Sequence, residues 1–210
     1  DALVLTHDDV DHLGGAAEVV RRIGARRVLG APRVPPRELG TEPIDIGDRI
    51  RLGARTTVEV LSPPARLPAA TESDNDTGLV LLVTVGERRV LIPADIEAPA
   101  ERQLARSGWP LRADAIVVPH HGSRTSSTPE FLRAVAPGIA IVSVGARNPY
   151  GHPVAEVLAR YAPTPLYRTD EVGDVTLRSD GTRLWVRAAR DAGDARTTSR
   201  ATVGPREQRR

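Results

Sequence analysis

Short apolar runs of strand length alternate along the chain with stretches in which apolar residues recur at helical spacing. The apolar runs predict strands over Ala2–Leu5, Arg27–Leu29, Asp48–Leu52, Thr56–Leu61, Leu79–Val85, Arg88–Pro93, Ala113–Val118, Ile139–Val144, Val172–Arg178 and Arg183–Arg187. The helical spacing predicts helices over Ala16–Ile23, Pro99–Ser107, Pro129–Val135 and Val154–Tyr161. Short turns such as Gly86-Glu87 are typical of hairpins between neighbouring strands. This mixture predicts an α+β domain in which helices cover sheets.

Three segments interrupt or end this pattern. Pro32–Pro43 and Ser62–Ser73 are rich in proline and small residues and are predicted to be loops. Beyond Ala189 the chain has almost no large apolar residue, so it buries too little surface to offset the entropy of ordering. We therefore predict one domain over residues 1–188 and a disordered, Arg-rich tail over residues 189–210.

Composition narrows the chemistry. A chain of 210 residues with 40% hydrophobic residues can bury a sizeable core. It has no cysteine, which excludes disulfides and thiolate metal ligands, so any transition metal must be held by histidine and carboxylate. All 29 basic residues are arginine, and the net charge of +2 favours an anionic partner only weakly. No apolar run reaches the ~18–20 residues that span a bilayer.

The five histidines share one position relative to the predicted strands, since each lies in a loop that follows an apolar run. They are His7, His12, His120, His121 and His152. Strand ends fix the loops that follow them, and such loops commonly carry functional side chains. A single histidine there would be an ordinary surface residue. Five histidines in such loops, each beside Asp, Gly or Pro, predict a shared site.

The densest group is His7-Asp8-Asp9-Val10-Asp11-His12. Alternate residues of an extended loop point the same way, so His7 and Asp9 can share one ion. Asp11 and His12 can then bind a second ion. Charges packed this closely repel one another unless a cation neutralises them. The alternative is an acidic N-terminal cap, in which Asp11 stabilises the helix that follows.

This segment resembles the HxHxDH signature of the metallo-β-lactamase superfamily, with Asp9 in place of the second histidine. Further along, Leu91–Glu97 resembles the superfamily's strand-then-Asp motif, with Asp95 as the aspartate. Two segments, Pro119–Ser126 (PHHGSRTS) and Asn148–Pro153 (NPYGHP), are similar to those of ComEC-type competence proteins. Ser73–Thr77 resembles a polar turn of the same family, and the similarity extends from Asp1 to about Ala188.

The resemblance implies a metallo-β-lactamase αββα sandwich. The family's domain has two or more strands and an Asp-Gly-Gly turn upstream of the strand at Ala2–Leu5, so we expect a sandwich that is missing its first strands. A sheet without them would expose an edge and part of the core. Ala94 also stands where the family usually has glycine before the bridging aspartate.

The resemblance also implies a site that holds two divalent metal ions, Zn²⁺ or Mn²⁺, and no small-molecule cofactor. Asp95 would bridge the ions. His7 and Asp9 would hold the first ion, and Asp11, His12 and His152 the second. The complete set of expected metal ligands is His7, Asp9, Asp11, His12, Asp95, His121 and His152. The expected catalytic residues are Asp11, His120, His121 and Ser123, with His120 or His121 completing the ligand shell or donating a proton to the leaving oxygen.

The activity implied is hydrolysis of DNA phosphodiesters by a nuclease that degrades one strand during DNA uptake. The expected partners are single-stranded DNA, bound without sequence preference, and the membrane channel of a full-length protein. The domain itself is expected to be soluble, at the cytoplasmic face of the cell membrane that holds the full-length protein. The Ser123–Ser127 loop suits a phosphate backbone, or else is a solvated loop that caps the helix at Pro129. The tail is either a solvated terminus or a non-specific DNA contact.

Two alternatives stay open. The same fold can hydrolyse a lactone, a thioester or another small ester, although the HHGS and YGHP segments favour the competence family. The chain can also be a truncated, metal-poor remnant with a binding or structural role, as the missing upstream strands suggest. Trp109 and Trp185 are expected to pack in the core or at a sheet edge rather than to form base-stacking platforms, and no sequence-reading role is assigned to them.

Overall fold

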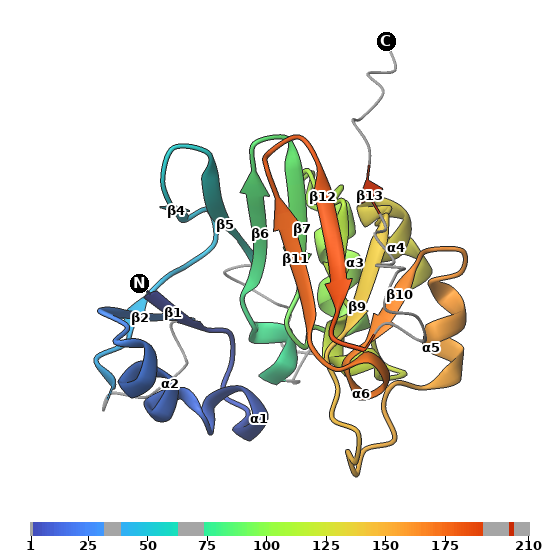
Figure 1. The fold of residues 1–210 in the computed structure, drawn as a ribbon, viewed down its shortest axis with the longest axis horizontal. Coiled ribbons are helices and arrows are strands. Elements are labelled where there is room, and N and C mark those ends of the chain that lie inside the picture. Colours follow the sequence, from blue (N-terminus) through green and yellow to red (C-terminus); the bar gives the residue numbers. More distant parts are fainter. Residues whose placement is uncertain (1, 32–38, 63–73, 191–201, 204–210) are drawn as a thin grey trace.

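A seven-stranded sheet forms the centre of the protein in a computed structural model that describes residues 2–31, 39–62, 74–190 and 202–203 (Figure 1). In spatial order its strands are β10 (Leu166–Arg168), β9 (Ile139–Val142), β8 (Ala115–Val117), β7 (Arg88–Ile92), β6 (Val80–Val85), β5 (Thr56–Ser62) and β4 (Arg49–Arg51). Each pair of neighbouring strands from β4 to β7 is antiparallel, whereas each pair from β7 to β10 is parallel. The carboxyl ends of β7, β8 and β9 therefore meet at one edge of the sheet.

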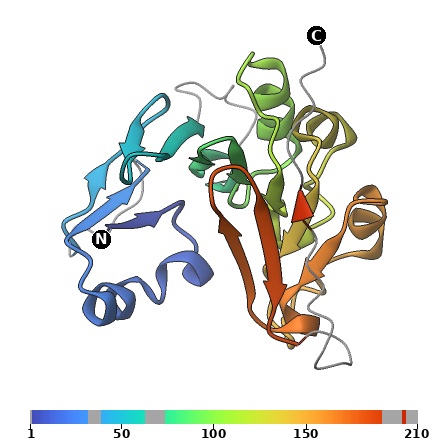
Figure 2. The same cartoon turned by 45° about the horizontal axis from the view of Figure 1, so that its top comes forward.

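Two smaller sheets lie beside the central one. The first is parallel and consists of β1 (Ala2–Leu5), β2 (Arg27–Gly30) and β3 (Glu42–Pro43). The second is antiparallel and consists of β11 (Val175–Ser179), β12 (Leu184–Ala188) and β13 (Thr202–Val203). Figures 1 and 2 show the β11–β12 hairpin lying across one face of the central sheet. Ile139 and Ile141 of β9 pack there against Leu184 and Val186 of β12.

Helices cover the opposite face of the central sheet. They are α3 (Ala98–Arg106), α4 (Pro129–Val135) and α5 (Ala155–Arg160). Because side chains alternate along a strand, Ile116 of β8 packs in the helical core with Phe131 and Val157, while its neighbour Ala115 contacts the β11–β12 layer. The amino-terminal part has its own core, in which Leu5, Ala16 and Leu29 pack with residues of β5 and β6.

Two further helices, α1 (Val10–Leu13) and α2 (Ala16–Ile23), follow β1, and α6 (Thr169–Val172) follows β10. Ala16 of α2 is buried in the amino-terminal core, so this helix covers the small parallel sheet. The order of layers is therefore helix, sheet, sheet, helix, as the αββα prediction requires. None of the helices in the described part of the chain is long and apolar enough to cross a bilayer.

The hairpin predicted at Gly86-Glu87 forms between β6 and β7. Gly86 has φ +58°, and a Cβ atom there would lie 2.7 Å from the carbonyl oxygen of Gly181 in the β11–β12 turn. Glu87 donates a backbone hydrogen bond to the same carbonyl at 2.7 Å. The two turns are thus in direct contact, which fixes the β11–β12–β13 sheet over the central sheet.

Several elements differ from the sequence prediction. The strand predicted from Val172 begins at Val175, because residues 169–172 form α6. The short elements β3, β10 and α1 were not predicted: segments of two to four residues carry too little periodicity, and β3 falls within the loop predicted over Pro32–Pro43. His12 consequently lies in a helix rather than in a loop.

The predicted tail also departs from expectation at one point, since Thr202–Val203 forms β13 and pairs with β12 at Trp185 and Leu184. Residues 191–201 and 204–210 of the tail lie outside the described residues, as do 32–38 and 63–73 of the two predicted loops. Trp109 packs against the helical core, as predicted.

Candidate metal centre

The candidate site lies at the edge of the central sheet where β7, β8 and β9 end. Asp95 follows β7, and His120 and His121 lie in the turn η3 (Pro119–Gly122) that follows β8. The loop after β1 reaches the same edge, because Leu79 at the start of β6 donates a hydrogen bond of 3.0 Å to the carbonyl oxygen of Thr6. Loops that are distant in sequence thus meet at one place.

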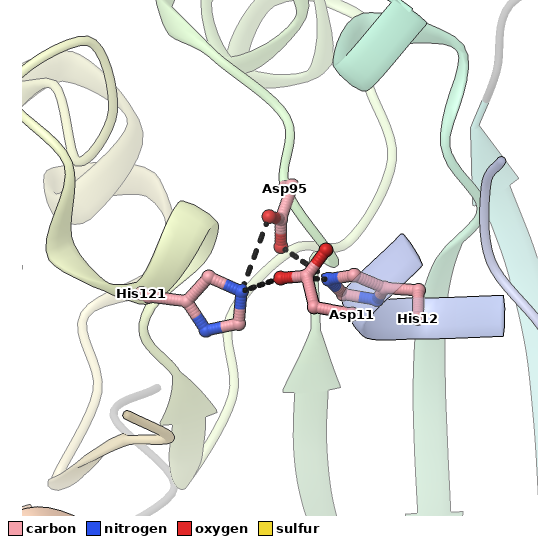
Figure 3. Close-up of side chains that lie close together, drawn as sticks. All are labelled: Asp11, His12, Asp95 and His121. Carbon is pink, nitrogen blue, oxygen red and sulfur yellow. Dashed lines mark ion pairs between the residues drawn. The ribbon is translucent and has the colours of Figure 1, made fainter. Parts of the chain in front are cut away.

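Four side chains converge there: Asp11, His12, Asp95 and His121 (Figure 3). One potential ligand atom from each lies within 4.8 Å of all the others. The two Asp95 oxygens lie between the imidazoles, with Oδ1 3.3 Å from His12 Nε2 and Oδ2 3.3 Å from His121 Nε2. Asp11 Oδ2 lies 3.2 Å from His121 Nε2 and 3.7 Å from His12 Nε2. We call these residues the four-residue group.

The orientation of His121 is fixed by the main chain. Its Nδ1 lies 2.7 Å from the carbonyl oxygen of Ser143, an acceptor, so Nδ1 carries the proton and donates. Nε2 then faces carboxylate oxygens of Asp11 and Asp95, which are also acceptors. Such an arrangement needs a second proton or a cation at Nε2. In the metal-free protein the proton is held tightly, because Asp95 raises the pKa of His121 to about 9.

Asp95 is the buried anion of the group. Burial alone would raise its pKa, but the imidazoles of His12 and His121 outweigh burial and hold the pKa of this carboxyl well below its usual range. An ionised carboxylate in a buried position is costly unless cations face it. Asp95 therefore stays charged and able to bind a cation throughout the physiological pH range.

His7 and Asp9 lie next to the four-residue group. His7 is 1% exposed, its Nε2 is 3.4 Å from Asp9 Oδ2, and its ring centroid is 4.0 Å from that of His12. The hydroxyl oxygen of Thr6 lies 3.0 Å from His7 Nδ1 and 3.3 Å from His12 Nδ1, which leaves both Nε2 atoms turned away from it. Burial, followed by the charge of His12, lowers the pKa of His7. A neutral imidazole is the form that binds metals.

The donor set fits divalent cations. The buried Nε2 atoms of His7, His12 and His121 have no hydrogen-bond partner among the described residues. Buried nitrogens of this kind normally have a partner, and here they face carboxylates that are themselves acceptors. Imidazole and carboxylate without thiolate suit Zn²⁺ and Mn²⁺.

A second polar cluster adjoins the four-residue group. His120 Nδ1 lies 3.3 Å from Glu97 Oε1, and the Thr125 hydroxyl donates to the same oxygen at 2.9 Å. Ser123 Oγ lies 3.0 Å from Thr125 Oγ1, and the ring of His152 lies 5.8 Å from that of His120. Glu97 was missed by sequence analysis, although it lies two residues beyond Asp95. Burial and the neighbouring His120 and His121 lower the pKa of His152.

The backbone is strained at the turns that carry the site. Ala94, His120 and His121 have φ values of +53°, +48° and +52°, in the left-handed region that residues other than glycine rarely adopt. His120 donates a backbone hydrogen bond of 3.1 Å to the carbonyl oxygen of Ala94, so the two strained turns are joined. Strain of this kind occurs where the surrounding structure holds functional groups in place.

The structure thus divides the predicted site residues into three sets. Asp11, His12, Asp95 and His121 form the four-residue group, and His7 and Asp9 adjoin it. His120, Ser123 and His152 lie in or beside the Glu97 cluster. His121 occupies the place beside Asp11 and His12 that the resemblance implied for His152.

The fold and these residues define a class. The chain belongs to the metallo-β-lactamase superfamily, whose family model matches residues 1–146. The fold agrees: 80% of the chain superimposes on a solved structure from Parabacteroides distasonis, with a TM-score of 0.54, 17% identity and coverage of 76% of that chain. CmlA, a diiron beta-hydroxylase from Streptomyces venezuelae, gives a TM-score of 0.51 at 18% identity over 80% of this chain and 43% of its own.

Within the superfamily the chain is similar to competence proteins. It is 32% identical to ComE operon protein 3 of Bacillus subtilis over 85% of this chain and 24% of that protein. It is 31% identical to Recombination protein 2 of Haemophilus influenzae over 90% of this chain and 24% of that protein. The chain is also 32% identical to competence protein ComA of Neisseria gonorrhoeae over 82% of this chain and 24% of that protein. These similarities confirm the predicted resemblance to ComEC-type proteins, and the chain spans about a quarter of the length of the curated relatives it matches.

Proposed function

We propose that this domain is a metal-dependent nuclease that hydrolyses DNA phosphodiesters. The observation that carries the proposal is the convergence of Asp11, His12, Asp95 and His121 within 4.8 Å, with buried imidazole nitrogens facing an ionised carboxylate. When bound, divalent cations neutralise charge on a phosphate ester and lower the pKa of water, which is the chemistry that hydrolysis needs.

The side chains take distinct parts in this proposal. The four-residue group would hold one cation, and His7 with Asp9, which adjoin the group, would hold a second. The Thr6 hydroxyl orients the rings of His7 and His12 by contacting their Nδ1 atoms. The carbonyl oxygen of Ser143 orients the ring of His121 in the same way. Supporting contacts of this kind commonly change metal affinity by about 10–100-fold when they are removed.

Proton transfer is assigned to His120. Glu97 faces its Nδ1 at 3.3 Å, which orients the ring, and in the doubly protonated form of His120 the Nε2 atom carries the transferable proton. As the water oxygen bonds to phosphorus and the bond to the leaving oxygen breaks, the proton on Nε2 passes to that oxygen, and the proton that the water releases returns to the imidazole. Glu97→Gln is expected to lower kcat for DNA cleavage by about ten-fold or more, with metal affinity unchanged.

The names of the relatives support a role in DNA uptake. Competence protein ComA is named for competence, and both it and ComE operon protein 3 are about four times as long as the matched segment. We propose that the domain acts on single-stranded DNA without sequence preference, at the cytoplasmic face of the membrane, joined to a channel in the full-length protein.

The proposal is tested by incubating the purified chain with end-labelled single-stranded DNA and Mn²⁺ or Zn²⁺. Cleavage should require the metal, stop with chelator and fall at least about 10²-fold in Asp95→Ala. Asp8→Asn is the matched control, because Asp8 is an exposed carboxylate of the same loop that lies outside the four-residue group. Equal cleavage by wild type and Asp95→Ala would overturn the proposal.

The same assay separates the alternatives. A hydrolase of small esters would act on a lactone or thioester in an Asp95-dependent manner and leave DNA intact. A non-catalytic remnant would bind neither Mn²⁺ nor Zn²⁺ in a manner that depends on Asp95.

A further inference from the structure

A hollow of about 280 Å³ opens directly beside the four-residue group. Its lining includes Asp11 and His121 of that group together with Asn148, Tyr150, His152 and Thr169. The volume lies just below the ~300–1,000 Å³ typical of sites for drug-sized ligands, so the hollow suits a group about as large as one nucleobase. A ligand there would touch the residues assigned to metal binding.

Tyr150 is the exposed aromatic wall of this hollow. Its side chain is 76% exposed, and its ring is nearly parallel to that of His152, with an interplanar angle of 17° and centroids 6.2 Å apart. The buried aromatic rings Phe131 and Tyr161 show that this protein places other aromatic side chains in its core. Single apolar residues scattered over a surface are common, whereas a large exposed ring beside a candidate metal centre indicates a surface that binds a ligand.

The loop that carries Tyr150 is held in shape by one side chain. Asn148 Nδ2 donates to the carbonyl oxygens of His152 at 2.8 Å and of Gly145 at 3.1 Å, and Asn148 Oδ1 accepts from the backbone N–H of His152 at 3.1 Å. The chain from 148 to 152 is therefore closed on itself around the tyrosine. A ring presented in this way loses little conformational entropy when a ligand stacks on it.

Several polar groups of the hollow are already engaged. Both amide atoms of Asn148 bond to the main chain, and Thr169 Oγ1 bonds to the backbone N–H and carbonyl of Val144, each at 2.8 Å. Ser143 uses its carbonyl oxygen to orient His121. These groups are therefore not available to read the edge of a base, whereas the π-face of Tyr150 accepts any base.

We infer that Tyr150 is a stacking platform for the base of the nucleotide next to the phosphate at the four-residue group. This inference rests on the proposed function and specifies its substrate as an unpaired nucleotide of any sequence. A base within a duplex has both faces covered by its neighbours, so only a single strand or an unpaired end can present a free face to the ring. Preference for single strands and indifference to sequence then have one structural cause.

The test is binding of fluorescent, phosphorothioate-linked oligothymidylate, which resists cleavage, measured by anisotropy in Mn²⁺. Stacking on an aromatic side chain is worth about 1–3 kcal/mol per base, so Tyr150→Ala should raise Kd by about ten-fold, within a range of roughly 5–150-fold. Tyr150→Phe retains the ring and should bind like the wild type. An oligomer of the same length that has abasic sugars should bind wild type and Tyr150→Ala equally.

The outcomes separate this inference from the proposed function. If Tyr150→Ala binds oligothymidylate as tightly as wild type, or if wild type does not bind it, the stacking platform is wrong. If Tyr150→Ala loses affinity for the abasic oligomer to the same extent, the tyrosine supports the loop and does not stack on a base. Cleavage of ordinary single-stranded DNA by the wild type, tested with the Asp95→Ala control, decides the nuclease activity independently of these results.

Discussion

Gly122 joins the two loops that carry most of the histidines, and its replacement by alanine gives a quantitative test of that junction. Gly122 has φ +84°, and an added Cβ would lie 2.5 Å from Cβ and 3.1 Å from Cα of Pro153, next to His152. Left-handed strain costs about 1 kcal/mol and forced overpacking about 1–3 kcal/mol. Gly122→Ala should therefore lose about 2–4 kcal/mol of stability, or about 4–16 °C in Tm for a domain of this size.

The assay is thermal unfolding followed by circular dichroism in chelator, with Gly24→Ala as the control. Gly24 has φ +61° but no atom within 4 Å of an added Cβ, so this variant introduces the backbone strain without the steric clash. It should lose only about 1 kcal/mol. If Gly122→Ala unfolds at the same temperature as Gly24→Ala, the close contact between Gly122 and Pro153 is absent and the arrangement of the two loops is wrong.

Three further variants test other parts of the structure. Ala94→Gly relieves a φ of +53° and should stabilise the protein by about 0.5–1 kcal/mol in urea unfolding; a loss of stability would contradict this strain. In chelator, Asp95 raises the pKa of His121 from 6.5 to about 9, so this contribution to stability is complete below pH 6.5 and lost as pH rises through about 9. The Tm should accordingly fall more steeply over that range in wild type than in His121→Gln, and equal slopes would refute the pairing. Asp114→Ala removes the carboxylate 3.2 Å from buried Arg88 and should cost about 3–5 kcal/mol in urea unfolding; a simultaneous loss of Mn²⁺ affinity would contradict its placement away from the metal centre.

The parts of the fold that the sequence predicted are those with strong local patterns. The helix over Ala16–Ile23 repeats its apolar face over two turns, and the hairpin at Gly86-Glu87 has apolar strands on both sides of a tight turn. β10 and α6 were missed because Leu166–Arg168 and Thr169–Val172 are too short to show a period. Thr202–Val203 pairs through backbone hydrogen bonds, which composition does not reveal.

The candidate site was predictable as a set of residue types, but its internal arrangement was not. The resemblance to the superfamily implied that His121 and His152 both belong near Asp95. It did not indicate which imidazole joins the four-residue group, because that depends on the left-handed turn at His120-His121 and on the carbonyl oxygen of Ser143. The contact between Glu97 and His120 joins segments after different strands, so only the folded chain brings it about.

Anomalous diffraction from crystals soaked in Zn²⁺ tests the metal centre most directly. We predict an anomalous peak enclosed by Asp11, His12, Asp95 and His121, about 2.0–2.2 Å from the imidazole nitrogens and carboxylate oxygens that bind the ion. A map with no peak among these four side chains, or with zinc bound only elsewhere on the protein, would contradict the account.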